Sequence, residues 1–187
     1  MEKLLETSDF YLRQFNYEDS LLLYELDSDP EVMKFITKGV KTPLRQIEYE
    51  ILPRILAYYK TYHGLGVWAA HTHDDHKFIG WFHLRPDRIE PPELELGYRL
   101  KKDYWGRGFA TSGSKALLEM GFGKWKALKI CARTLAENAA SQRVMEKAGL
   151  HFEKKFVYSL ETIPDWPEKD RRAVKYSLTR DDYYKQA

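Results

Sequence analysis

The sequence is poor in the features that would place it in several special classes of protein. It has a single cysteine, Cys131, so no disulfide can form within the chain, which is typical of a reducing compartment. It contains no apolar run long enough to span a membrane, and residues 1–6 lack the apolar core of a signal peptide. We therefore expect a cytoplasmic protein without a membrane partner.

The chain also lacks an excess of charge of one sign. Its 30 Lys and Arg residues nearly balance 28 Asp and Glu residues, and the formal net charge is +2. Domains that bind nucleic acids usually carry dense basic runs, which are missing here, so we expect no nucleic-acid partner. The 43% of hydrophobic residues in 187 is ordinary for a globular protein with a substantial core. We expect one domain over residues 1–187.

The hydrophobic pattern predicts a first half rich in helices. A short strand is expected over 10–15, followed by helices over 17–26, from Pro30, and over 43–59. Pro53 lies inside the last of these, and it predicts a kink or two shorter helices.

The second half alternates strands with helices. Strands are expected over 67–71, 78–85, 93–100, 129–134, 152–159 and 171–179, and helices over 110–122 and 139–147. Units of strand, helix and strand predict a mixed sheet with helices packed against it. The expected fold class is therefore α+β, with a mixed α/β order of elements.

A glycine-rich turn joins one of these strands to the next helix, and its sequence is Trp105-Gly106-Arg107-Gly108-Phe109-Ala110-Thr111. Glycines let backbone N–H groups approach a ligand, and a helix N-terminus adds unpaired donors and partial positive charge. Arg107 adds a full charge, so the turn is a candidate site for a pyrophosphate. The alternative is a tight turn without a ligand, since neither the Walker ending nor the three-glycine dinucleotide fingerprint is present.

Three segments together resemble the Gcn5-related N-acetyltransferase (GNAT) family. Residues 105–110 are similar to its cofactor motif, Arg/Gln-x-x-Gly-x-Gly/Ala, with Trp105 in place of Arg or Gln. Residues 136–150 resemble the signature Asn-x-x-Ser-x-x-Val-x-x-Lys-x-Gly-Phe of the branch of ribosomal-protein N-terminal (RimJ/RimL-type) acetyltransferases, and Glu95-Leu96-Gly97-Tyr98 matches that branch too. The resemblance implies a mostly antiparallel, twisted sheet of about seven strands with helices on both faces.

The resemblance also implies acetyl-CoA as co-substrate and an amine that attacks it directly in a ternary complex. The residues implied to bind the cofactor are Tyr98, Leu100, Gly106, Arg107, Gly108, Phe109, Ala110, Thr111 and Asn138. The backbone of Tyr98 and Leu100 is expected to bind the pantetheine arm as an added strand would. Asn138 also precedes a predicted helix, where it would act as an N-cap, and both roles can hold at once.

Acetyl transfer needs a proton acceptor for the amine and a donor for the departing thiolate. An α-amine with a pKa near 8 loses its proton at pH 7 for about 1.4 kcal/mol, against about 4.6 kcal/mol for a lysine side chain. We expect Glu95 to be the base, with Glu93 as the weaker candidate, and a salt bridge or solvated face as the alternative for both. Many relatives use a Tyr as acid where this chain has Met145. Ser141, one turn earlier, is therefore the expected donor, unless its hydroxyl only bonds its own backbone.

The remaining candidates are weaker. No cysteine lies near His71, His73 and His76, and their spacing is not that of a structural zinc site, so no metal is expected. Cys131 is expected in the core. Four aromatic residues on neighbouring strands are expected either in an acceptor pocket or in the core: Trp68, Trp81, Phe82 and His83.

Two functions from different classes stay open. The first is an enzyme that acetylates a primary amine, either a protein N-terminal α-amine or a small molecule. The second is a catalytically weak or inactive acetyl-CoA-binding sensor or interaction module, because Met145 and Trp105 depart from the family pattern. The sequence does not identify the acceptor, and it leaves the oligomeric state open, a homodimer included. Residues 17–66 are expected to form one wall of the acceptor site.

Overall fold

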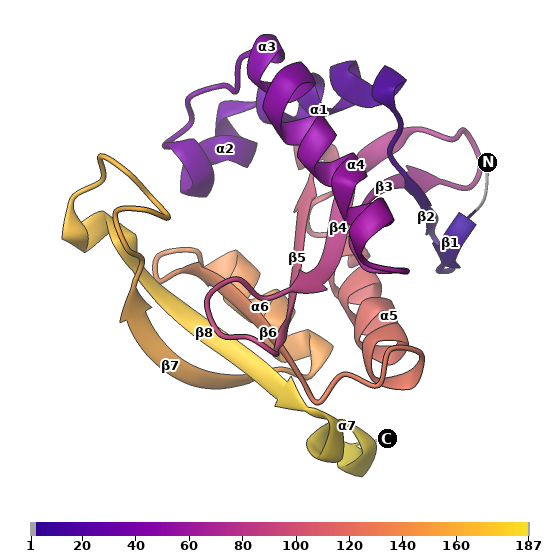
Figure 1. Ribbon diagram of the computed structural model, residues 1–187, viewed down its shortest axis with the longest axis vertical. Helices are drawn as coiled ribbons and strands as arrows, with labels where there is room; N and C mark the ends of the chain where they lie inside the picture. Colours follow the sequence, from indigo (N-terminus) through magenta and orange to yellow (C-terminus); the bar gives the residue numbers. More distant parts are fainter. Residues whose placement is uncertain (1–2, 187) are drawn as a thin grey trace.

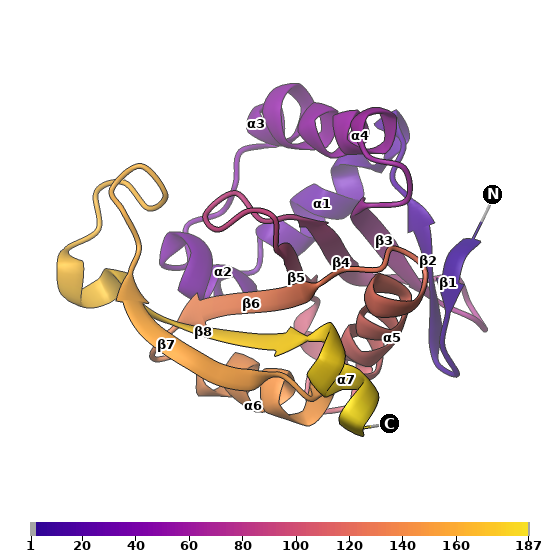
Figure 2. The same ribbon diagram turned by 60° about the horizontal axis from the view of Figure 1, so that its bottom comes forward.

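The computed structural model describes residues 3–186, and its centre is one eight-stranded sheet (Figures 1 and 2). The strands are β1 (Lys3–Glu6), β2 (Phe10–Gln14), β3 (Gly66–Thr72), β4 (Phe78–Pro86), β5 (Leu94–Leu100), β6 (Lys129–Leu135), β7 (His151–Val157) and β8 (Arg172–Thr179). Their order in the sheet is β1-β2-β3-β4-β5-β6-β8-β7, and β5 and β6 form the parallel pair among otherwise antiparallel neighbours. The expected α+β class is confirmed, with one strand more than expected, because the four residues of β1 are too few and too exposed to give a pattern.

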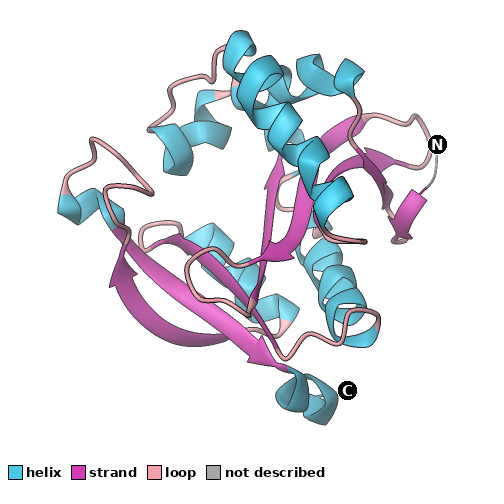
Figure 3. Cartoon of the chain, in the orientation of Figure 1, coloured by secondary structure: helices cyan, strands magenta, loops and turns pink. Residues whose placement is uncertain are grey.

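Helices cover both faces of this sheet (Figures 2 and 3). One face carries α1 (Ser20–Asp27), α2 (Pro30–Thr37), α3 (Leu44–Gln46) and α4 (Leu52–Thr61), and the other carries α5 (Phe109–Gly123), α6 (Ala139–Ala148) and the C-terminal α7 (Arg180–Gln186). A π-helical turn, Ile47–Ile51, joins α3 to α4 directly before Pro53, so the expected irregularity at this proline is present. Within the described residues, no helix combines the length and the apolar character needed to cross a membrane.

Alternating side chains on the strands supply a hydrophobic core to each face. On β3, Trp68 and Ala70 belong to the core under α5, while Val67 and Ala69 belong to the core under α1–α4. Gly113 lets α5 lie close to β4, because a Cβ built there would come within 2.4 Å of the Phe82 ring. The N-terminus of α5 is therefore held firmly beside the central strands.

The sheet opens between its two central parallel strands. β5 pairs with β6 only at Leu94 with Ile130 and at Glu95 with Cys131, whereas β4 pairs with β5 along its whole length. Among residues 3–186, the edge of β5 that faces β6 has no strand partner from Leu96 to Leu100, and Figure 1 shows the two strands diverging. We call this V-shaped divergence of the two strands the wedge; it is closed at Glu95 and open toward the end of β5.

Candidate active site

The glycine-rich turn lies at the open end of the wedge, directly after β5. Gly106 and Gly108 have φ angles of 70° and 87°, which favour glycine, and a Cβ built on either would meet nothing within 4 Å. These glycines are thus required by the backbone, and the space above them is open to a ligand. Gly108 is the N-cap of the 15-residue helix α5 and provides no side-chain cap for it.

The backbone donors of this helix end are therefore free to bind an anion. The first α-helical bond at this end runs from the Ser112 N–H to the Gly108 carbonyl oxygen. The amides of Phe109, Ala110 and Thr111 precede that bond, so they lack an intrahelical acceptor. Three such donors, the helix dipole and an open space are features of an anion-binding helix end, so the pyrophosphate site stays a prediction.

Two side chains fix the shape of the turn. The Trp105 indole N–H donates to the Leu100 carbonyl oxygen at 2.8 Å, so the residue that departs from the family motif ties the turn back to β5. The Arg107 guanidinium lies over the rings of Tyr104 and Phe109, at 5.3 and 5.1 Å from their centroids. It also borders a hollow of about 420 Å³ beside the β3–β4 turn. The hydrogen bond from Trp105 uses one of the two acceptor positions of the Leu100 carbonyl oxygen, on a residue expected to contact the pantetheine arm.

The first turn of α6 faces β5 across the wedge. Asn138 is the N-cap of α6, and its side chain accepts from the Ser141 N–H at 3.2 Å. The Tyr98 phenol lies half-buried against the Phe82 ring and close to the Ser141 side chain. Burial raises the pKa of the Tyr98 phenol, and the nearby Ser141 hydroxyl offsets part of the rise. Met145 is a buried member of the core.

Glu95 lies at the closed end of the wedge and is held in an ion pair. Its Oε2 accepts from Arg85 Nη2 at 2.8 Å and from Arg85 Nε at 3.2 Å. Its Oε1 lies 3.8 Å from Arg133, and its Oε2 lies 3.9 Å from His83 Nε2. The salt bridge that the sequence left as an alternative is thus present, on a carboxylate whose side chain keeps 17% exposure.

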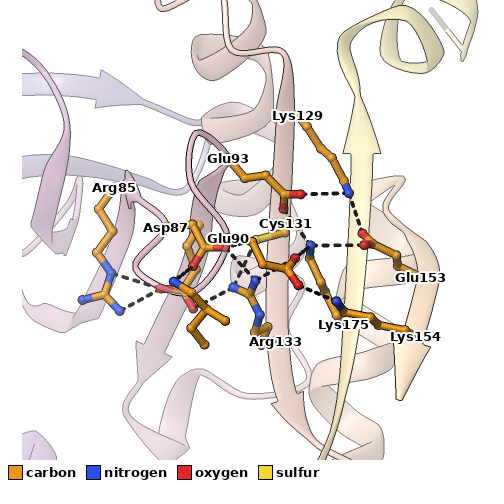
Figure 4. A network of polar contacts seen from close by, with 12 residues as sticks. Arg85, Asp87, Glu90, Glu93, Lys129, Cys131, Arg133, Glu153, Lys154 and Lys175 are labelled. Atoms are coloured by element: carbon orange, nitrogen blue, oxygen red, sulfur yellow. Dashed lines mark hydrogen bonds and ion pairs between the residues drawn. The ribbon is translucent and has the colours of Figure 1, made fainter. Parts of the chain in front are cut away.

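The second candidate base, Glu93, belongs to a polar network between the β4–β5 loop and strands β6, β7 and β8, which Arg133 connects to Glu95 (Figure 4). Glu93 contacts Lys129 at 2.9 Å and Lys175 at 2.8 Å. Arg133 holds Asp87 at 2.6 Å. These pairs anchor the loop between β4 and β5 onto β6 and β8, so Glu93 has a structural setting.

Two clusters in this network have the ligand types of a metal site. They are Asp87, Glu93 and Cys131, and Glu90, Glu93 and Glu153, each with oxygen or sulfur atoms within 4.8 Å of one another. Lysine and arginine side chains already neutralise both clusters. Burial raises the pKa of the Cys131 thiol, which disfavours the thiolate that a metal would need. Cys131 is fully buried in the sheet, as expected.

The face of β4 and β5 that points to α1–α4 carries further polar groups that the sequence pattern did not single out. Arg99 pairs with Asp27 of α1 at 2.5 Å and lies over the Trp81 ring. His83 stacks on Trp81 with centroids 5.6 Å apart. Tyr158 follows β7. Burial raises the pKa of its phenol most, and the negative charge of nearby Glu95 raises it further. The sequence did contain one sign of these groups. Gly97 lies in the middle of β5, and a glycine inside a strand often marks a place where another group comes close to the backbone.

Comparison with known proteins agrees with this geometry. The chain matches the model of the Acetyltransferase (GNAT) domain over residues 9–151. It is 27% identical over 187 residues to FsC-acetyl coenzyme A-N(2)-transacetylase of Aspergillus fumigatus, with 96% of this chain and 77% of the fungal protein covered. It is 31% identical over 152 residues to the uncharacterized protein YkkB of Bacillus subtilis, with 80% and 86% covered.

Solved structures give the same fold. The RimL ribosomal α-N-protein acetyltransferase, solved in complex with coenzyme A, has a TM-score of 0.76 at 15% identity, with 95% of this chain and 98% of that chain covered. The family model spans most of the sequence and includes the wedge, the glycine-rich turn and α6. The chain therefore belongs to the GNAT family of acetyltransferases, whose members use acetyl-CoA as acetyl donor.

Proposed function

We propose that this protein transfers the acetyl group of acetyl-CoA to an α-amine by direct attack in a ternary complex. The observation that carries the proposal is the wedge between β5 and β6, with an anion-binding turn at its open end and Glu95 at its closed end. A chain that binds a long phosphorylated thioester needs both an anchor for the phosphates and an extended row of backbone groups for the arm. The wedge supplies the two together.

The residues around the wedge fit such a donor. The amides of Phe109 to Thr111 and the Arg107 charge would hold the pyrophosphate. The free edge of β5 from Leu96 to Leu100 spans about 16 Å at about 3.3 Å per residue, and it offers backbone groups to an extended arm. When bound there, the donor supplies an activated thioester carbonyl close to Glu95.

The choice of an α-amine rests on the chemistry of the site and on the names of relatives. The fungal relative is named for transfer to a nitrogen designated N(2), and the RimL structure is named for an α-N-protein activity. An α-amine loses its proton at pH 7 for about 1.4 kcal/mol, so it needs only a weak base. The groups at the closed end of the wedge, Glu95 in its ion pair with Arg85 and the imidazole of His83, suit that requirement.

In this proposal Glu95 orients or deprotonates the amine, and Ser141 donates to the departing thiolate. The position of the Tyr98 phenol close to Ser141 supports the second role, because the phenol can return a proton to the hydroxyl. Met145 occupies the core, so it leaves the acid role to that pair.

Release of free thiol from acetyl-CoA tests the function directly. The assay is run with peptides that begin with Ala or Ser, with α-amino acid derivatives, with polyamines and with aminoglycosides. We expect turnover with one or more α-amine acceptors and little with amines of pKa near 10. Binding of acetyl-CoA without thiol release over the whole panel would indicate the sensor or interaction module instead.

Two substitutions test the assigned roles. We expect Glu95→Gln to lower kcat/KM by about 10²-fold or more and to change its pH profile, in keeping with the size of general acid–base effects. Full activity with an unchanged profile would remove Glu95 from the mechanism. We expect Ser141→Ala to lower kcat at least tenfold with an unchanged KM for acetyl-CoA, and a loss of less than a few-fold would exclude the donor role.

A further inference from the structure

The side chain of His83 is buried, and its Nε2 atom has no hydrogen-bond partner in the described part of the chain. The residue is 7% exposed. A buried polar atom without a partner destabilises a folded protein, because it has lost its hydrogen bonds to water. Such an atom in a folded protein calls for an explanation, and a polar ligand is one of the few available.

Gly97 is what allows the imidazole to reach its position. His83 and Gly97 are direct partners in the pairing of β4 with β5. A Cβ built on Gly97 would lie 2.7 Å from both Cε1 and Nε2 of the ring. The ring therefore lies across the backbone of β5 where any other residue would exclude it. Its Nε2 is directed toward Glu95, 3.9 Å away, at the closed end of the wedge.

Neighbouring groups hold the ring in place and keep it without charge. Trp81 stacks against it at an interplanar angle of 16°. Burial, together with the charges of Arg85 and Arg99, lowers the pKa of His83 well below its usual range, so Nε2 can offer a lone pair at neutral pH. The charged and titratable groups around this place are Arg85 from β4, Glu95 and Arg99 from β5, Asp27 from α1, Tyr58 from α4 and Tyr158 from the loop after β7.

A second atom on the same face also lacks a partner. It is Nε of Arg99, on the next residue of β5 that points to this side of the sheet. One acceptor and one donor left open next to each other suit a ligand that carries both an N–H group and a carbonyl oxygen, as an α-amine beside a carbonyl does.

We propose that His83 is a catalytic residue of this acetyltransferase, whose Nε2 accepts the hydrogen bond and then the proton of the attacking α-amine. The inference rests on the proposed function. The amine nitrogen adds to the thioester carbonyl carbon and loses its proton to Nε2; the C–S bond then breaks, its electron pair goes to sulfur, and the carbonyl forms again. Attack turns the nitrogen into an ammonium on the former carbonyl carbon, whose proton is far more acidic than that of the free amine, so a weak base is sufficient. Glu95, 3.9 Å away, stabilises the resulting imidazolium.

Chemical rescue tests this role. We expect His83→Ala to lower kcat/KM at least 10²-fold, to change the affinity for acetyl-CoA less than threefold, and to regain activity with added imidazole in a saturable manner. His71→Ala is the matched control, because His71 is also buried with an unpartnered Nε2 and a pKa lowered by burial, but it lies on β3 beside Tyr11. That variant should keep its kcat/KM and show no response to imidazole.

The outcomes separate the two proposals. A His83→Ala protein within fivefold of wild type would overturn the catalytic role. A loss that imidazole does not restore, or one that accompanies an equal loss of acetyl-CoA affinity or thermal stability, would assign His83 to structure alone and overturn it as well. If the wild-type protein releases no thiol with any α-amine, the proposed function fails first, and the measured affinity for acetyl-CoA shows that the protein is folded.

Discussion

Replacement of Lys175 by Met should destabilise the protein by about 3 kcal/mol. The ammonium group is fully buried, and its partners are Glu90, Glu93 at 2.8 Å and Glu153 at 3.2 Å (Figure 4). Removing one partner of a buried ion pair costs about 3–5 kcal/mol, because the charges left behind are uncompensated. The low end applies here, since the three carboxylate side chains keep 14–30% exposure and each has a second cation.

Thermal and urea unfolding measure this change. For a chain of this length, about 1 kcal/mol shifts Tm by about 2–4 °C, so Lys175→Met should lower Tm by about 6–12 °C. Lys154→Met is the matched control, because Lys154 also contacts Glu90 but its side chain is 47% exposed, and such pairs contribute about 0–1 kcal/mol. If the free energies of unfolding of the two variants differ by less than about 1 kcal/mol, burial of the Lys175 ammonium group does not determine its contribution to stability.

The pH dependence of the difference follows from the carboxylate pKa values. Hydrogen bonds from Lys154 and Lys175 lower the pKa of Glu90 to about 2. Burial opposes ionisation of Glu153, but hydrogen bonds from Lys129, Ser177 and Lys175 outweigh it and lower its pKa to about 2. A carboxylate whose pKa is lowered in the folded state stabilises the fold at any pH above its unfolded pKa, which is about 4.3 for Glu. This contribution is lost as the pH falls toward 2. The difference in free energy of unfolding between wild type and Lys175→Met should thus be full at pH 7 and shrink between about pH 5 and pH 2.

Two further predictions concern the glycine-rich turn. Gly108→Ala should cost about 1–2 kcal/mol of stability, because alanine at a φ of 87° is strained, and it should raise the KM for acetyl-CoA more than tenfold with a smaller change in kcat, because the new methyl group fills the open space. An unchanged KM would show that the phosphates bind elsewhere. Trp105→Phe should cost about 1 kcal/mol and raise the same KM a few-fold, because it removes the hydrogen bond to Leu100. A stability equal to wild type would show that this bond does not hold the turn.

The features that the sequence predicted well are those set by neighbours in the chain. Asn138 caps α6, and Gly149 ends it with a φ of 100°, because each acts on backbone groups within a few residues. Local chemistry also explains why Pro53 coincides with a π-helical turn. The expected helices and strands accordingly lie close to their observed bounds, although the strand expected over 152–159 ends at Val157.

What the sequence did not predict depends on which strands become neighbours. The ion pair of Glu95 with Arg85 requires the register of β4 against β5, which no local pattern reveals. The contact of His83 with Gly97 has the same origin. The burial of Lys175 among three carboxylates needs the loop after β4 to fold onto β8, a contact between segments more than 80 residues apart. A lysine in a strand pattern gives no sign of this, because most lysines are exposed.

The two departures from the family pattern carry less weight against catalysis once their surroundings are considered. An inactive protein would not need an ordered glycine-rich turn. Here the Trp105 indole N–H donates to the Leu100 carbonyl oxygen and so holds that turn against β5. Met145 is a core residue, and Ser141 lies one helical turn before it in the first turn of α6. The imidazole of His83 lies over Gly97 of β5 and beside Glu95, at the closed end of the wedge, and an interaction module has no need of this arrangement. The placement of these groups favours the enzyme over the module.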